Sequence, residues 1–253
     1  MFVLLPILFA SVSWLYAMAG FGGGSTYIAL LAVSGLPLTA VPVVALSCNF
    51  IVSGQGSIAL IKRGHARRSI LLPLLVGSIP AAFLGGAWRL PQSAFIGILA
   101  AALSVAGVAM LVQRKFSKPN ERVVQAPPAV RLFGVGIALG LLAGITGIGG
   151  GIYLAPVMHL LGWSRAQTIA ACTSIFIALN SMAGLTGHLT KGTDFVGTLP
   201  LMVLIACPIA VLGGGGLGTY FLTNKLPQER IRVITAAVIL LVAARLWMRV
   251  LFA

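Results

Sequence analysis

The sequence predicts an all-α membrane protein that crosses the bilayer several times. Of its 253 residues, 59% are hydrophobic and 8% are charged, and the mean hydropathy is +1.07. A soluble globular protein carries about 25% charged residues. The runs 70–87, 94–112 and 195–211 contain no formal charge, and helices of this length cross about 30 Å of hydrocarbon. The alternating ten-residue segments typical of a membrane barrel are absent from the sequence.

About eight apolar segments are expected, and two of them are longer than one crossing needs. The long ones are the first and the fifth, and each contains a glycine-rich run, "GFGGGS" at 20–25 and "GITGIGGG" at 144–151. Each glycine weakens a helix by about 0.8–1.0 kcal/mol relative to alanine, so we expect both segments to be broken there. The segments are 1–34, 39–61, 69–87, 91–112, 132–161, 166–189, 195–222 and 231–252.

The two halves of the chain resemble each other. "GFGGG" at 20–24 matches "GIGGG" at 147–151, "IPAAFLGG" at 79–86 matches "CPIAVLGG" at 207–214, and "LPQSAF" matches "LPQERI" in the same order. This pattern predicts an internal duplication of four segments. We therefore expect a first transmembrane repeat at 1–112, a polar basic linker at 113–131 and a second transmembrane repeat at 132–253. In transporters, such repeats commonly place the substrate site at their interface.

The net charge of +14 fits a membrane protein and does not indicate a nucleic-acid partner. The 17 Lys and Arg residues lie mostly in short segments between apolar runs, which is where membrane proteins keep them. If each long segment crosses once, twelve of these charges fall on one side, which predicts that both termini and the linker are cytoplasmic. A re-entrant first and fifth segment would reverse these sides and allow antiparallel repeats, and the sequence leaves both arrangements open.

The glycine-rich runs are candidate anion sites. Irregular backbone in a membrane is tolerated only where protein or a water-filled cavity surrounds it. Each run precedes a short helical piece, whose first N–H groups and positive dipole end favour an anion. The simpler alternative is close helix packing through small residues. The predicted substrate-binding residues of the two runs are Gly22, Gly23, Gly24, Ser25, Gly149, Gly150 and Gly151.

Polar side chains in the second and sixth segments are further candidates. Asn49, Thr173, Ser174 and Asn180 lie within apolar runs, and their hydroxyl and amide groups can donate hydrogen bonds to an oxyanion. Interhelical hydrogen bonding is the alternative for each of them. His188, near the end of the sixth segment, is a candidate proton or substrate contact, or alternatively an interfacial side chain.

Residues for catalysis or metal binding are not apparent. The three acidic residues, Glu121, Asp194 and Glu229, fall in predicted loops, and the three histidines are scattered. Cys48, Cys172 and Cys207 follow no metal or disulfide spacing. We therefore expect no enzyme activity, no catalytic residues, no metal site and no cofactor.

The glycine-rich signatures resemble those of the TauE/SafE family of membrane permeases, also called sulfite exporters. The resemblance rests on "GFGGGSTYIALL" and more strongly on "GITGIGGGIYLAPVMHLLGWSRAQTIAACTSIFIALNSMAGLTGH". Ala29 departs from the second copy, which has Pro156 at the matching position. The resemblance implies a secondary transporter or facilitator that exports sulfite, a sulfonate or a similar anion across the bacterial inner membrane. A membrane scaffold or assembly subunit is the alternative.

The expected partners are a small anionic substrate and the lipid bilayer. The sequence leaves open which anion is carried, whether protons or the membrane potential drive it, and whether copies associate as a homo-oligomer.

Overall fold

The computed structural model describes residues 4–18, 20–37, 39–88, 127–192 and 199–224, with scattered positions in 91–112 and 240–248. Throughout these residues the regular structure is helical. Most of the expected linker and of the eighth segment, and part of the fourth segment, lie outside the described residues, as do Glu121, Asp194 and Glu229. The described helices are α1 (Leu4–Ala17), α2 (Gly24–Val33), α3 (Val41–Lys62), α4 (Arg68–Ala87), α6 (Ala129–Thr146), α7 (Gly151–Leu160), α8 (Ala166–Leu189) and α10 (Leu201–Asn224).

Five of these helices contain apolar stretches long enough to cross a membrane, namely α3, α4, α6, α8 and α10. They have at least 18 residues each, and at 1.5 Å per residue that length matches the hydrocarbon core. α1 is apolar but shorter. The prediction of a helical, polytopic membrane protein is therefore confirmed.

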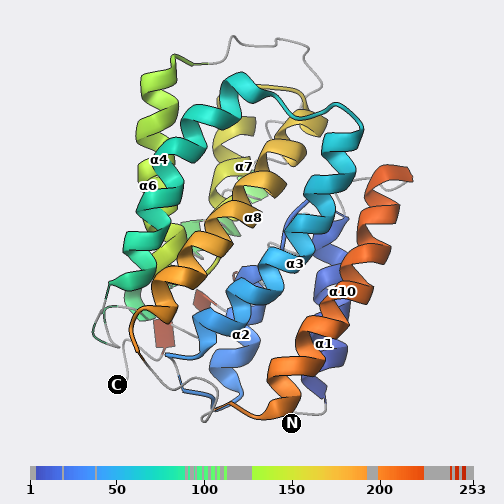
Figure 1. Ribbon diagram of the computed structural model, residues 1–253, viewed down its shortest axis with the longest axis vertical. Helices are drawn as coiled ribbons and strands as arrows, with labels where there is room; N and C mark the ends of the chain where they lie inside the picture. Colours follow the sequence, from blue (N-terminus) through green and yellow to red (C-terminus); the bar gives the residue numbers. More distant parts are fainter. Residues whose placement is uncertain are drawn as a thin grey trace.

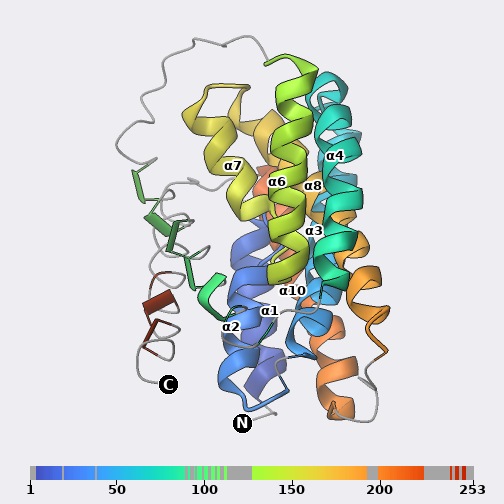
Figure 2. The ribbon, with the colours of Figure 1, turned by 90° about the vertical axis from the view of Figure 1, so that its left-hand side faces the viewer.

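Four helices, α1, α2, α6 and α7, form two pairs that enter from opposite ends of the molecule (Figures 1 and 2). α1 rises from the lower end to about mid-height, and α2 returns from there to the lower end. α6 descends from the upper end to about mid-height, and α7 returns to the upper end. The described residues between the helices of each pair, 18 and 20–23 in the first and 147–150 in the second, are not helical. Both turns therefore lie in the middle of the molecule.

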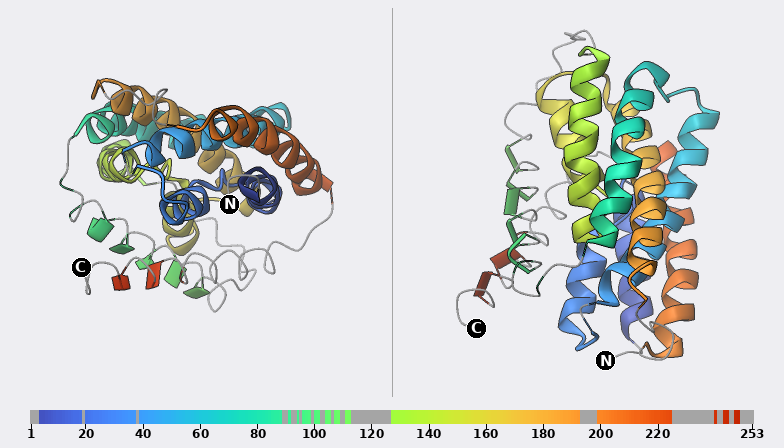
Figure 3. Two further views of the ribbon diagram at one scale, coloured as in Figure 1. Left: turned by 90° about the horizontal axis from the view of Figure 1, so that it is seen from below. Right: turned by 60° about the vertical axis from the view of Figure 1, so that its left-hand side comes forward.

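Glycines allow several helices to pack closely against one another. α4 packs against α6, and α1 against α10, on either side of a central α3–α8 pair (Figure 3). A Cβ atom on Gly140 of α6 would collide with the backbone of Ser78 in α4, and one on Gly218 of α10 with the Trp14 carbonyl of α1. Small residues of this kind allow membrane helices to touch backbone to backbone.

Most of the cationic residues that the structure describes lie at the upper end. Lys62, Arg63, Arg67 and Arg68 lie at the α3–α4 turn, and Arg165 precedes α8 at that same end, while Lys191 follows α8 at the lower end. If each long segment crossed once, Lys191 would lie on the same side as Lys62 and opposite Arg165. The structure differs because the α1–α2 and α6–α7 pairs each turn back before they reach the far side.

Candidate functional site

The first turn, described at residues 20–23, is shaped by glycines in the left-handed region. Gly20 and Gly23 have φ angles of +77° and +91°, which only glycine adopts readily. The end of α1 is capped, because the Gly20 N–H donates to the Ala17 carbonyl over 3.1 Å and the Phe21 N–H donates to the Tyr16 carbonyl over 2.9 Å. α2 then begins at Gly24, so its first amides face the middle of the molecule.

The second turn, residues 147–150, has a similar backbone. Gly147, Gly149 and Gly150 have φ angles of +74°, +78° and +80°. The Gly147 N–H donates to the Ala143 carbonyl over 2.9 Å and caps α6. α7 then begins at Gly151.

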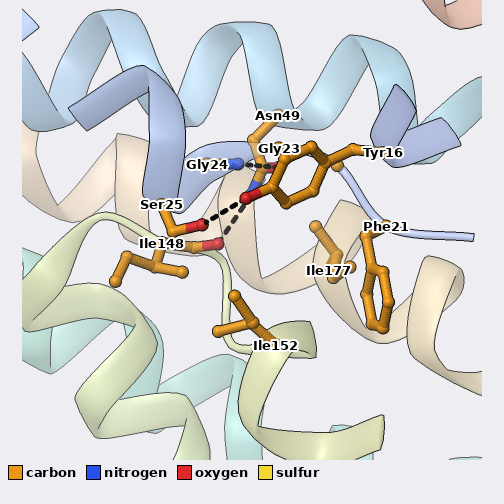
Figure 4. A pocket seen from close by; sticks show the side chains of 10 residues that line it. Tyr16, Phe21, Gly23, Gly24, Ser25, Asn49, Ile148, Ile152 and Ile177 are labelled. Carbon is orange, nitrogen blue, oxygen red and sulfur yellow. Dashed lines mark hydrogen bonds between the residues drawn. The ribbon is translucent and has the colours of Figure 1, made fainter. Parts of the chain in front are cut away.

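Asn49 of α3 joins the two turns (Figure 4). Its Oδ1 accepts a hydrogen bond of 3.1 Å from the Gly24 N–H, and its Nδ2 donates one of 2.9 Å to the Ile148 carbonyl. Nδ2 also donates to the Ser181 hydroxyl over 3.1 Å. A Cβ atom on Gly22 or Gly149 would collide with the Asn49 carboxamide. The glycines therefore leave the room that this side chain occupies.

A small cavity of about 10 Å³ lies beside Asn49. A site for one water needs at least about 10–15 Å³ by this measure, so the cavity is too small for a polyatomic anion. One wall is polar and is formed by the start of α2, Asn49 and Tyr16. The other wall is apolar and consists of Phe21, Ile148, Ile152 and Ile177.

Tyr16 is a site residue that the sequence analysis missed. Its hydroxyl lies 2.6 Å from the Thr26 Oγ1 and 3.3 Å from the Ser25 Oγ, which links the end of α1 to the start of α2. The phenol ring lines the cavity. The available signal was a polar aromatic side chain one turn before the first glycine run.

The predicted site residues divide into two groups. Gly22, Gly23, Gly24, Ser25 and Asn49 line the cavity. The glycines of the second turn lie against other helices: a Cβ on Gly149 would meet Asn49 and Ser181, one on Gly150 would meet Phe176, and one on Gly151 would meet Ile177 and Thr173.

The three polar candidates of α8 are not among the residues that line the cavity. The Ser174 hydroxyl donates to the Gly20 carbonyl over 2.8 Å, and the Asn180 Nδ2 donates to the Phe176 carbonyl over 2.7 Å. The Thr173 Oγ1 and the Asn180 Oδ1 are buried without a hydrogen-bond partner.

His188 links α8 to α6 away from the cavity. Its Nε2 lies 2.9 Å from the Gly144 carbonyl, and its Nδ1 lies 3.1 Å from the Lys191 Nζ. An ammonium group has only donors and a carbonyl only accepts, so the contacts require Nδ1 to accept and Nε2–H to donate. The ring is therefore neutral in this arrangement.

Among the described residues, no group of three or more His, Cys, Asp or Glu side chains could hold a metal ion. The thiols of Cys48, Cys172 and Cys207 are buried and free.

Five apolar helices of membrane-spanning length, packed around two glycine-rich turns, define a polytopic α-helical membrane protein. The chain belongs to the TauE/SafE family, because the family model described as "Sulfite exporter TauE/SafE" matches residues 4–246. The resemblance noted in the sequence is thereby confirmed.

Two relatives match along nearly their whole length. The "Probable membrane transporter protein y4hK" of Sinorhizobium fredii is 30% identical over 245 residues, which cover 96% of each chain. The "Probable membrane transporter protein YunE" of Bacillus subtilis is 27% identical over 271 aligned positions, which cover 97% of each chain. No solved structure matches the chain significantly. The relatives and the family support a membrane transporter.

Proposed function

We propose that the protein is a secondary transporter or facilitator that exports a small sulfur-containing oxyanion, such as sulfite or a sulfonate, across the inner membrane. The observation that carries this proposal is the meeting of the two glycine-rich turns at Asn49 beside a small cavity. The family description, sulfite exporter, supports the choice of anion.

The backbone supplies positive potential at this point. α2 and α7 both begin near mid-height, so their positive dipole ends point toward the centre of the molecule (Figure 2). The carbonyl ends of α1 and α6 are capped by the N–H groups of Gly20, Phe21 and Gly147. Since no cationic side chain is among the residues that line the cavity, we assign anion binding to the start of α2, residues Gly22 to Ser25, beside Asn49. Gly149, Gly150 and Gly151 then shape the second turn, where Gly151 lies against Thr173. Ser174 holds the first turn through the Gly20 carbonyl, and Asn180 bonds within α8.

Two inverted repeats, 1–112 and 132–253, account for the packing. Gly20 of the first turn lies against α8, where a Cβ atom on it would be 3.0 Å from the Cβ of Ala170. Gly147 of the second turn lies against α3 in the same way, where a Cβ atom on it would be 2.8 Å from the Cβ of Pro42. The α4–α6 and α1–α10 pairs correspond under the same exchange of halves. An axis between α3 and α8 would relate the repeats, with the site at their interface.

The charge distribution then orients the protein. Cytoplasmic loops carry an excess of Lys and Arg, so the upper end, with the α3–α4 turn and Arg165, faces the cytoplasm in our proposal. The start of α1 is at the opposite end (Figure 1). This replaces the cytoplasmic N-terminus expected for straight crossings with one on the outer side.

Flux measurements in proteoliposomes test the function. The purified protein is supplied with sulfite, sulfate, thiosulfate, sulfonates and carboxylates, and we expect flux of the sulfur oxyanions. Tyr16→Phe removes one hydroxyl from the cavity wall and should raise the apparent KM. The matched control is Ser57→Ala, which removes a hydroxyl bonded within α3 to the Ser53 carbonyl. Absence of flux for every anion, with folded wild-type protein, would favour the scaffold function.

A further inference from the structure

The hydrogen bonds of Asn49 use its whole carboxamide. The Gly24 N–H can only donate and the Ile148 carbonyl can only accept, so the orientation of Oδ1 and Nδ2 follows from the network. The second Nδ2 hydrogen is taken by the Ser181 hydroxyl. The side chain is buried, with 1% of its surface exposed. In this arrangement neither the Asn49 carboxamide nor the Gly24 N–H is free to bind a substrate.

We infer that Asn49 is an internal competitor of the transported anion. Its Oδ1 accepts the hydrogen bond of the Gly24 N–H until an oxygen of the anion displaces this Oδ1. The inference rests on the proposed function and concerns the same site. It assigns Asn49 as a gating residue in place of the simple substrate donor expected from the sequence.

The size of the cavity requires such a displacement. A volume of about 10 Å³ holds one water at most, whereas a sulfur oxyanion has several heavy atoms. The carboxamide lies between the first residue of α2 and the carbonyl of Ile148. Rotation of this side chain both enlarges the cavity and exposes the amide at the positive end of α2.

The charge of the anion makes the exchange favourable. Hydrogen bonds to an ionised acceptor are shorter and roughly twice as strong as those between neutral groups. A negative charge is also stabilised at a helix N-terminus. An anion can therefore replace the neutral amide oxygen of Asn49 as the acceptor of the Gly24 N–H. A neutral water molecule replaces it less readily.

Displacement also separates the two turns. Asn49 lies on α3, and its bonds reach the first turn, the second turn and α8. When its carboxamide rotates away, the bonds to Ile148 and Ser181, which link the two halves, are lost together. Anion binding thus favours a state in which the halves can move relative to one another, which alternating access requires.

The deciding experiment measures sulfite and methanesulfonate affinity, by thermal shift and by flux, for wild type, Asn49→Ala and Ser181→Ala. Asn49→Ala removes the competitor and should lower the apparent Kd about three- to tenfold, which corresponds to the free energy of about one net hydrogen bond. Ser181→Ala removes one hydrogen-bond acceptor of the Asn49 Nδ2 and should lower the apparent Kd by a smaller factor. Ser53→Ala, which removes a hydroxyl bonded to the Asn49 carbonyl and leaves the carboxamide in place, is the control and should not change it.

The sign of the change distinguishes the outcomes. Weaker binding by Asn49→Ala, alongside normal wild-type flux, would make Asn49 a direct substrate donor and overturn the inference alone. If Asn49→Ala does not fold, the Ser181→Ala variant decides: unchanged or weaker affinity would overturn the inference. A folded wild-type protein that neither binds nor transports any anion of the panel would overturn the proposed function, and the inference with it.

Discussion

The Ser174 hydroxyl donates a hydrogen bond of 2.8 Å to the Gly20 carbonyl and so connects α8 with the turn between α1 and α2. Asn49 makes a corresponding connection from α3 to Ile148 in the turn between α6 and α7. Each central helix therefore holds the turn that belongs to the other half of the chain. These bonds fix the positions of both turns relative to the α3–α8 pair.

Replacing Ser174 by alanine should affect stability and leave transport affinity unchanged. The substitution leaves the Gly20 carbonyl without this donor, and a net hydrogen bond contributes about 1 kcal/mol. For a protein of this size, the melting temperature in detergent should fall by about 2–4 °C. Ser47→Ala is the control, since its hydroxyl only bonds the Val43 carbonyl within α3. A raised KM at unchanged melting temperature would instead make Ser174 a substrate contact.

Two glycines of α6 should respond oppositely to alanine. A Cβ on Gly140 would collide with the Ser78 carbonyl of α4, whereas one on Gly134 would meet nothing within 4 Å. Gly140→Ala should lower stability by about 1–3 kcal/mol, because the two backbones must separate. Gly134→Ala should be neutral or slightly stabilising, because alanine favours helix. Equal melting temperatures for the two variants would contradict the close α4–α6 packing.

The inverted arrangement predicts which side of the membrane three positions at or near helix ends face. Cysteines are placed singly at Ser69, Ser164 and Thr190, after replacement of the three native cysteines by alanine. A membrane-impermeant maleimide applied to intact cells should spare Ser69→Cys and Ser164→Cys and label Thr190→Cys. Straight crossings predict the reverse for positions 164 and 190. Labelling of all three after permeabilisation shows that each thiol is reactive.

The membrane class could be predicted from composition and run length because a bilayer tolerates few charges and requires about 20 apolar residues per helix. The direction in which each helix runs could not be predicted from these features. Residues 1–34 are long enough for a tilted crossing or for a hairpin, and only the packing of α1 against α10 and of α2 against α3 decides between them. The positive-inside count depends on whether residues 1–34 cross once or form a hairpin. The side of the membrane assigned to each loop therefore changes with the hairpin.

The site was predictable in part, for a similar reason. Glycine runs mark positions where the backbone can turn, so Gly22 to Ser25 could be selected from the sequence. Periodicity assigns a residue to a helix face but not to a neighbour, so Ser174 and Asn180 were grouped with Asn49 although they do not line the cavity. Tyr16 was missed because its position beside the cavity depends on how the chain turns after Ala17.

The same geometry changes which glycine variants are informative. Gly23 and Gly150 have φ angles of +91° and +80°, where a β-branched residue is strained. A valine at either position would therefore test folding as well as anion access. Tyr16→Phe is a cleaner probe because it keeps the ring that packs there.

The driving force is expected to be the membrane potential. Carriers that couple to protons or sodium commonly hold an Asp or Glu within the membrane, and α1 to α10 as described contain none, since the three acidic residues of the chain are Glu121, Asp194 and Glu229. With the cell interior negative, each exported elementary charge gains about 2.3 kcal/mol per 100 mV. For a singly charged anion, this gain corresponds to a concentration ratio of about 50-fold.

We therefore expect electrogenic export that needs no cation gradient. The measurement is anion flux from proteoliposomes at fixed pH while a potassium diffusion potential is varied, and flux should rise with the potential that drives the anion outward. His188 is the residue through which protons could act instead, although its ring is held between the Gly144 carbonyl and Lys191. His188→Gln should therefore reduce stability without changing the dependence on potential. Flux that follows a pH gradient, ignores the potential and loses its pH dependence in His188→Gln would establish proton coupling and disprove this prediction.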